Sequence, residues 1–166
     1  RVIRDFHKLP PYSLEKSEKE QLLLKELNQL TEMHRIKCIQ YANYLNAIGY
    51  AQKQARTLHE IPFVPIRIFK ELEMKSISDE DIFKIMMSSG TNGQKQSKIF
   101  LNKENAILQQ KVLLRILGNF VGSKRLPMLV IDSHAVISDR RLFTTRGATI
   151  MGLDFMAKKM VFALND

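Results

Sequence analysis

The first third of the chain places apolar residues at helical spacing. Leu23, Leu27 and Leu30 stand at positions i, i+4 and i+7 with charged and polar residues between them, so they predict a helix over residues 14–33. A second apolar set predicts another helix over residues 34–50 and consists of Ile36, Ile39, Tyr44, Leu45 and Ile48. Two consecutive helices form a hairpin, which either packs on a sheet or offers a surface to a partner.

From residue 61 onward the pattern changes to short apolar runs. Two prolines in Ile61–Ile66 exclude a helix interior and predict an extended connector. Later apolar runs predict four strands, over residues 82–87, 97–101, 126–131 and 159–164. The sequence between them predicts two helices, over residues 103–120 with Asn102 as the N-cap and over residues 147–156. The uninterrupted apolar character of the last two strands is typical of strands buried on both faces.

This alternation of strands and helices predicts an α/β fold. We expect an N-terminal helical hairpin followed by a partial mixed sheet with crossover helices. The corresponding domains are a helical front segment over residues 1–60 and an α/β domain over residues 61–166. The chain has 166 residues, of which 45% are hydrophobic, and both values suit a globular protein of about one domain. No apolar run approaches about 20 residues, so we expect no membrane span.

The positive charge of the chain is concentrated in its second half. The net charge is +9, and residues 81–166 contribute 13 Lys and Arg against 6 Asp and Glu. A positive potential attracts phosphates, nucleic acid, lipid headgroups or carboxylates. The single cysteine, Cys38, excludes an internal disulfide and a cysteine-built metal site, so the cytoplasm is the expected compartment. A lone cysteine on a helix is expected to pack in the core rather than to accept an acyl group.

The segment between the first two predicted strands has the composition of a phosphate-binding loop, Ser88-Ser89-Gly90-Thr91-Asn92-Gly93-Gln94-Lys95-Gln96-Ser97-Lys98. Its two glycines permit positive φ angles and a close approach of a ligand to the backbone. Successive N–H groups in such a turn form an anion-binding nest, to which the hydroxyl groups and the lysines would add. The spacing excludes a Walker A loop, because the glycines are too close together and residue 94 is Gln. A plain hairpin turn is the other interpretation.

Ser88–Gly93 resembles the Ser/Thr-Ser-Gly-Thr-Thr-Gly phosphate loop of the adenylate-forming superfamily. Three further segments are similar, in order and in rough spacing, to the acyl-protein synthetases, which are the luciferin-component ligases of bacterial bioluminescence and their relatives: Ile61–Pro65, Pro127–Ser133 and Arg146–Gly152. The resemblance covers about residues 55–166. It implies that the α/β domain belongs to the large N-terminal domain of an adenylate-forming enzyme, inside which this chain stops.

The resemblance also implies the site residues. It assigns ATP-phosphate binding to the loop residues Ser88, Ser89, Gly90, Thr91, Asn92, Gly93, Lys95 and Lys98. The superfamily loop usually continues Gly-x-Pro-Lys, so the departure here leaves open which of the two lysines serves the phosphates. Arg146 is expected to contact an anion, whereas Arg140 and Arg141 are either further contacts or solvated charges. No catalytic residue is assigned, and no histidine has metal-ligand spacing: His7, His34, His59 and His134.

By resemblance, the whole enzyme uses ATP and Mg²⁺ to activate a fatty acid. The carboxylate attacks the α-phosphate to give acyl-adenylate and pyrophosphate, and the acyl group passes to a cysteine of the enzyme and then to a reductase partner. These 166 residues alone are expected to be inactive and to cover exposed apolar surface by self-association.

Two other classes of function stay open. One is a basic, non-enzymatic module that binds nucleic acid or another polyanion, which the charge of residues 81–166 favours but which no nucleic-acid motif supports. The other is a regulatory or scaffold protein that keeps the fold without the reaction. ATP-dependent pyrophosphate exchange separates the enzyme from both.

Overall fold

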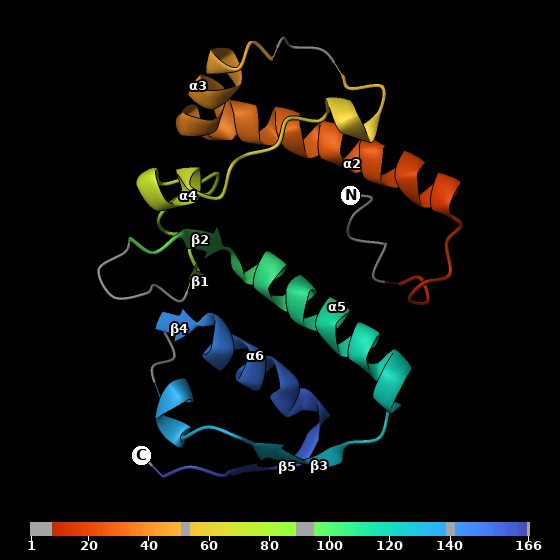
Figure 1. Ribbon diagram of the computed structural model, residues 1–166, viewed down its shortest axis with the longest axis vertical. Helices are drawn as coiled ribbons and strands as arrows, with labels where there is room; N and C mark the ends of the chain where they lie inside the picture. The colour runs from red at the N-terminus through yellow and green to blue at the C-terminus, as the bar shows by residue number, and fades with distance from the viewer. Residues whose placement is uncertain (1–7, 51–53, 89–94, 139–141, 166) are drawn as a thin grey trace. The chain divides into compact units, whose positions relative to one another are not determined.

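The computed structural model describes residues 8–50, 54–88, 95–138 and 142–165 of the chain. The chain forms two compact units, one over residues 1–78 and the other over residues 79–166 (Figure 1). The described part of the first unit is helical, whereas that of the second unit combines helices with strands. The protein is therefore of mixed α/β class, as the sequence predicts.

The first unit contains the predicted helical hairpin. Helix α2 spans Lys16–Lys37 and helix α3 spans Ile39–Ala47. Between them Cys38 has extended backbone, with φ −129° and ψ 104°, which ends one helix and begins the next. The two helices are confirmed, but the predicted boundary after residue 33 is wrong, because α2 continues to Lys37.

The core of the first unit is formed by Cys38, Tyr41 and Leu45, which are 2%, 8% and 1% exposed. Four partly buried residues pack against them, namely Tyr44, Tyr50, Val64 and Met74. The predicted apolar face of the second helix is therefore wrong in part, since three of its members are exposed: Ile36, Ile39 and Ile48. The extended residue between the helices breaks the helical period, so positions on its two sides do not share one face.

Side-chain hydrogen bonds hold the irregular segment after the hairpin onto it. The Asn28 side chain donates to the Ala55 carbonyl at 3.0 Å and accepts from the Ala55 N–H at 2.8 Å, as a neighbouring strand would. The Tyr44 hydroxyl donates to the Phe63 carbonyl at 2.6 Å and so fixes the proline-rich connector, which is outside any helix at residues 61–66, as predicted. Two short helices that the sequence analysis does not predict flank this connector: η1, Leu58–Glu60, and α4, Ile68–Glu71.

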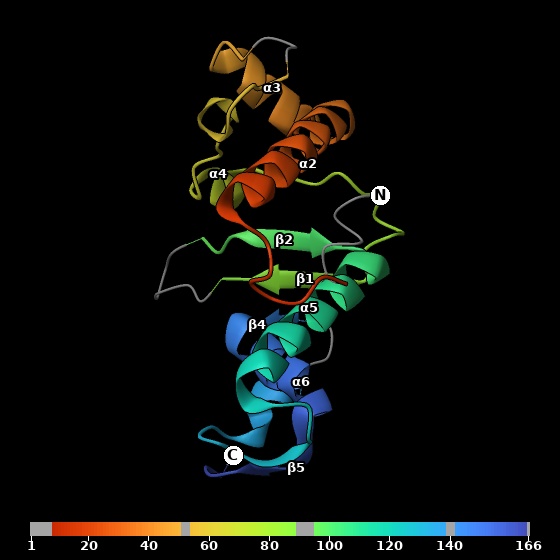
Figure 2. The same cartoon turned by 90° about the vertical axis from the view of Figure 1, so that its right-hand side faces the viewer.

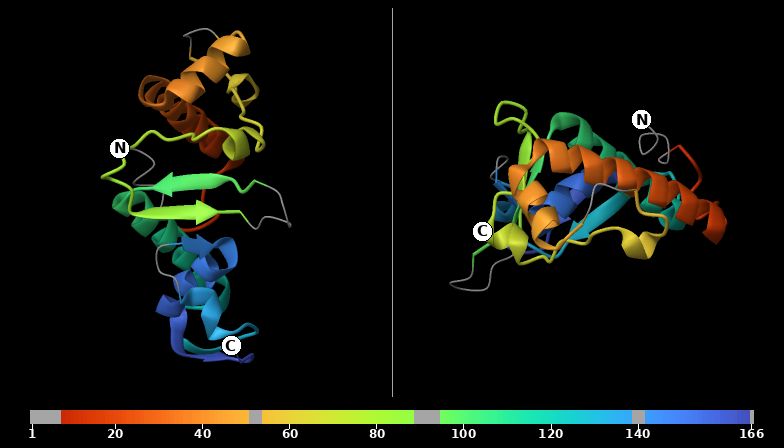
Figure 3. Two further views of the ribbon diagram at one scale, coloured as in Figure 1. Left: turned by 90° about the vertical axis from the view of Figure 1, so that its left-hand side faces the viewer. Right: turned by 90° about the horizontal axis from the view of Figure 1, so that it is seen from above.

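The second unit contains a mixed sheet whose strand order is β2-β1-β4. Strand β1, Lys84–Met87, pairs antiparallel with β2, Lys98–Leu101, and parallel with β4, Leu142–Thr144. The arrows of β1 and β2 run in opposite directions in Figure 2 and in the left view of Figure 3. Strand β4 is not among the four predicted strands, because three residues are too few to show the alternation of a strand.

A separate pair of parallel strands consists of β3, Leu126–Val130, and β5, Ala157–Phe162. Val130 and Ala157 are buried, whereas the register partners Leu129 and Val161 are 65% and 46% exposed. The prediction that both strands are buried on two faces is therefore wrong. An apolar run indicates a strand but does not distinguish one covered face from two.

The described part of the second unit contains two α-helices. Helix α5, Lys103–Val121, begins as predicted, because the Asn102 side chain accepts from the Asn105 N–H at 2.9 Å. Gly122, with φ 84°, ends this helix in a conformation that residues with a Cβ rarely adopt.

Helix α6, Thr145–Leu153, lies between β3 and β5 in the chain and is thus the predicted crossover helix. It is next to α5 in Figure 1. The two helices pack closely, because a Cβ added at Gly152 would lie 3.3 Å from the Leu113 side chain. Two 3₁₀ turns flank its ends in the chain, η2 at His134–Ile137 and η3 at Asp154–Met156.

A search for bilayer-spanning segments among the described helices found none with sufficient length and apolar character.

The buried core of the first unit yields a prediction for Leu45→Ala. Leu45 is 1% exposed, so truncation leaves a cavity and should lower the free energy of unfolding by roughly 2–4 kcal/mol. The matched variant Ile36→Ala truncates a side chain that is 71% exposed and should cost no more than about 0.5 kcal/mol. Urea unfolding followed by tyrosine fluorescence measures both, because all four tyrosines lie in this unit. Equal costs for the two variants would contradict this core.

His34 yields a prediction for the pH dependence of stability. Its Nδ1 lies 2.7 Å from the Ser76 hydroxyl, and burial, with a smaller contribution from Lys37, lowers the pKa of its imidazole below 6.5. The unfolded chain therefore binds more protons below pH 6.5, so the stability is complete above that value and falls as the pH drops toward the folded pKa. His34→Gln, which does not titrate, should flatten the change in urea midpoint between roughly pH 7.5 and pH 5.5. An unchanged slope in this variant would show that His34 is not the group responsible.

Candidate functional site

The base of the predicted phosphate loop is closed by two serines. The Ser88 N–H donates to the Ser97 carbonyl at 3.1 Å, and the Ser97 N–H donates to the Ser88 hydroxyl oxygen at 3.0 Å. Ser97 is 6% exposed, so this pair is a fixed part of the hairpin. The central residues of the loop lie outside the described residues, and they include the predicted contacts Ser89, Gly90, Thr91, Asn92 and Gly93.

The two candidate lysines lie on the strand that leaves the loop or just before it. Lys98 is the first residue of β2 and pairs in register with Met87, the last residue of β1. Lys95 and Lys98 are both exposed, as expected for cations that would meet a ligand from solvent. The described residues therefore bring Ser88 and Lys98 together, but they do not decide which lysine serves a phosphate.

The start of helix α6 lies at the same edge of the sheet as the loop. Because β1 and β4 are parallel, their carboxyl ends coincide, and Met87 pairs with Thr144. The loop begins at the next residue of one strand, and α6 begins at the next residue of the other. Ligands in α/β sheets bind beyond the carboxyl ends of the strands, and the first N–H groups of a helix attract anions there.

Arg146 is the second residue of α6 and forms an ion pair with Asp132. The Arg146 Nε lies 2.8 Å from the Asp132 Oδ2, and their side chains are 72% and 14% exposed. Asp132 follows β3, so the pair joins the end of a strand of the second sheet to a helix that starts at the first sheet. The helix predicted to begin at residue 147 begins instead at Thr145, so Arg146 belongs to its first turn.

Other contacts fix the Asp132 carboxylate. Its Oδ1 accepts from the Ser133 N–H at 2.9 Å, and its backbone carbonyl accepts from the Leu164 N–H at 3.2 Å. The sequence analysis did not select Asp132 as a site residue. An acidic residue directly after an apolar strand was the available signal, because that position lies at the carboxyl edge of the sheet.

The arrangement can bind an anion. Adjacent strands are about 4.8 Å apart, so the backbones of Lys98 and Thr144, which flank β1, are separated by roughly 10 Å. Lys98, the Ser88 hydroxyl and the start of α6 with Arg146 therefore occupy one short stretch of a single sheet edge. Cationic side chains and helix N–H groups at one edge suit phosphate or carboxylate oxygens.

The remaining predicted site residues are spread over both units. Arg140, Arg141 and His7 lie outside the described residues. His134, in η2, packs its ring edge-on against Phe162 with centroids 5.2 Å apart. Within residues 8–50, 54–88, 95–138 and 142–165, no group of three or more His, Cys, Asp and Glu side chains could hold a metal ion.

Cys38 lies in the core of the first unit, 2% exposed, and its thiol donates to the Gln40 side chain at 3.6 Å. The prediction that it packs in the core is confirmed, although it lies between two helices rather than on one. A thiol at this depth is not accessible to an acyl group.

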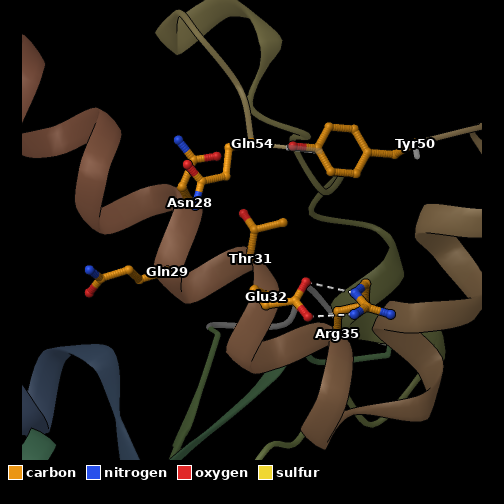
Figure 4. Close-up of a pocket in the computed structure, with 7 residues that line it drawn as sticks. All are labelled: Asn28, Gln29, Thr31, Glu32, Arg35, Tyr50 and Gln54. Atoms are coloured by element: carbon orange, nitrogen blue, oxygen red, sulfur yellow. Dashed lines mark hydrogen bonds and ion pairs between the residues drawn. The ribbon is translucent and has the colours of Figure 1, made fainter. Parts of the chain in front are cut away.

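A groove on the first unit is a concave site that the sequence analysis did not predict. It has a volume of about 450 Å³, and Figure 4 shows the side chains that line it, namely Asn28, Gln29, Thr31, Glu32, Arg35, Tyr50 and Gln54. The Arg35 guanidinium donates to both carboxylate oxygens of Glu32, a hydrogen-bonded pairing that lowers the pKa of this carboxyl group. The residues that line the groove are polar or charged in type, and no aliphatic residue is among them.

Comparison with known proteins identifies the family. The model of the family described as "Acyl-protein synthetase, LuxE" matches residues 6–159, which extend over most of both units. A search of curated proteins and a search of solved structures each found no match. The family match includes the loop base, the start of α6 and the Asp132–Arg146 pair. This chain therefore belongs to the LuxE acyl-protein synthetase family.

Proposed function

We propose that the protein activates a fatty acid with ATP and that this chain supplies its phosphate-binding loop. Membership of the LuxE family implies acyl-protein synthetase function and the use of ATP. In the proposed reaction a carboxylate oxygen of the fatty acid attacks the α-phosphorus of ATP. Pyrophosphate leaves, and the product is acyl-adenylate. A cysteine thiolate then attacks the acyl carbon, which forms a thioester and releases AMP, and a reductase partner consumes the thioester.

One observation carries the role of the loop. In a chain of this family, a Gly- and Ser-rich segment connects two antiparallel strands at the carboxyl edge of a sheet, and Ser88 and Ser97 close its base. Backbone N–H groups of such a loop would hold the β- and γ-phosphates. They would also stabilise the charge that develops on the departing pyrophosphate. Lys95 or Lys98 and Arg146 would add positive charge at the same edge.

Mg²⁺ belongs to the proposal through the nucleotide. In ATP-dependent enzymes this ion is held mainly by phosphate oxygens and water, together with one or two carboxylates, so a dedicated cage of protein ligands is not required. Its chemical contribution would be to neutralise the negative charge of the triphosphate while the α-phosphorus is attacked.

The domain assignment is also a proposal. Residues 61–166 would form part of the large N-terminal domain of an adenylate-forming enzyme, and residues 1–60 its helical front segment. The cysteine that accepts the acyl group would come from outside these 166 residues, because Cys38 is the single cysteine of the chain and is buried. A cytoplasmic location, where ATP and a reductase are available, fits this reaction.

The loop assignment predicts that Gly90→Val abolishes activation by the intact protein. A branched side chain there would block both the turn and the approach of phosphate to the backbone, so ATP–pyrophosphate exchange driven by the fatty acid should fall roughly 100-fold or more. The matched control is Gly118→Val in helix α5, where an added Cβ has no neighbour within 4 Å. Normal exchange by Gly90→Val, or an equal loss of exchange activity in both variants, would contradict the loop assignment.

The buried position of Cys38 predicts that Cys38→Ala leaves the acyl-enzyme intact. The substitution removes one buried sulfur and should cost about 1 kcal/mol of stability. Incubation of the intact protein with labelled fatty acid and ATP should therefore still label it. If labelling disappeared while the protein stayed folded by circular dichroism, Cys38 would be the acceptor and this part of the proposal would be wrong.

A further inference from the structure

We propose that Asp132 is a positioning residue that orients the Arg146 guanidinium toward an oxyanion at the loop edge of the sheet. The inference rests on the proposed function and deepens it, since it concerns the same site. The oxyanion is either a phosphate group of ATP or the carboxylate of the fatty acid, because both present paired oxygens that a guanidinium recognises.

The location of Arg146 on its helix is unusual for a cation. It is the second residue of α6, where the positive end of the helix dipole disfavours a cation. The helix itself therefore does not favour an arginine at this position, and Asp132 supplies the counter-charge. Residues that break such a local rule tend to occur at functional sites, and an anionic ligand at this helix end would offset the repulsion.

The geometry of the pair also bears on the role of Arg146. The Arg146 Nε lies 2.8 Å from the Asp132 carboxylate, which is itself fixed by a hydrogen bond from the Ser133 N–H. A guanidinium has five N–H donors, and Nε carries one of them, so pairing at Nε leaves the two Nη groups suited to bidentate contact with an oxyanion. Arg146 is 72% exposed and would otherwise lose considerable rotamer freedom upon binding the ligand.

The ion pair has different effects on stability and on binding. An ion pair in which one partner is largely exposed contributes little to stability. A pair that holds an arginine in one orientation before the ligand arrives lowers the entropic cost of binding instead. Because α6 begins at the residue after Thr144, which pairs with Met87, the backbone of Arg146 is close in sequence to the edge where the phosphates are proposed to bind, and in the proposed arrangement its two Nη groups are directed toward that edge.

The test is a double-mutant cycle in the intact protein. Asp132→Asn keeps a side-chain oxygen that can accept from the Ser133 N–H and removes the charge that orients Arg146. Arg146→Gln removes the cation itself. ATP–pyrophosphate exchange is measured for the wild type, both single variants and the double variant, first with ATP varied and then with the fatty acid varied. Arg125→Gln, which removes an exposed arginine elsewhere in the second unit, is the control for net charge.

We expect Asp132→Asn to raise the KM for one of the two substrates roughly tenfold, with little change in the unfolding temperature, and Arg146→Gln to raise it further. Asp132→Asn should have no additional effect in the Arg146→Gln background, and Arg125→Gln should behave as the wild type. The substrate whose KM rises identifies the oxyanion as the phosphate of ATP or as the carboxylate.

Several results would overturn the inference. Unchanged KM values in Asp132→Asn would do so, as would the same fold-loss in the presence and absence of Arg146, or an unfolding temperature that falls in proportion to activity. If the wild type catalyses exchange and Gly90→Val does not, such a result overturns the inference alone. If the wild type shows no exchange, the proposed function fails and the inference fails with it.

Discussion

The pairing of strand β1 on both of its sides is the constraint on which the second unit depends. Its antiparallel partner β2 brings Ser97 back to Ser88 and so closes the base of the loop. Its parallel partner β4 delivers the start of helix α6 to the same edge. Met87 is therefore level with Lys98 on one side and with Thr144 on the other. A slip of one residue in either ladder would turn every side chain of that strand to the opposite face. The loop base and the start of α6 would then no longer be aligned at this end of the sheet.

The ion pair between Asp132 and Arg146 adds the second sheet to this arrangement. Asp132 follows β3, and its backbone carbonyl is held by the Leu164 N–H beyond β5. Helix α6 in turn packs closely on α5 at Gly152. The guanidinium is thus attached to a helix and paired with a residue at a strand end, and sites supported by regular elements are held more accurately than sites on loops alone.

Features that depend on neighbours in the chain could be predicted from the sequence. Asn102 begins α5 because its own side chain accepts from the Asn105 N–H, and Gly122 ends it because glycine tolerates a positive φ. The composition of the loop also depends on neighbours in the chain, and the phosphate site that it predicts stays a prediction. The pairing of Arg146 with Asp132 could not be predicted, because the two residues are separated in sequence and meet only when α6 folds back toward the end of β3.

The sequence by itself determined the mixed α/β class, the helical hairpin, the loop between two strands and the resemblance to acyl-protein synthetases that the family match confirms. The tertiary structure decided which faces are covered, as the exposed Leu129 and Val161 show, and it made a strand of Leu142–Thr144. It also decided that Arg146 has a carboxylate partner. The physical reason is that turns, caps and helical periods arise from contacts between near neighbours. Burial, sheet pairing and ion pairs depend on segments that the chain brings together only on folding.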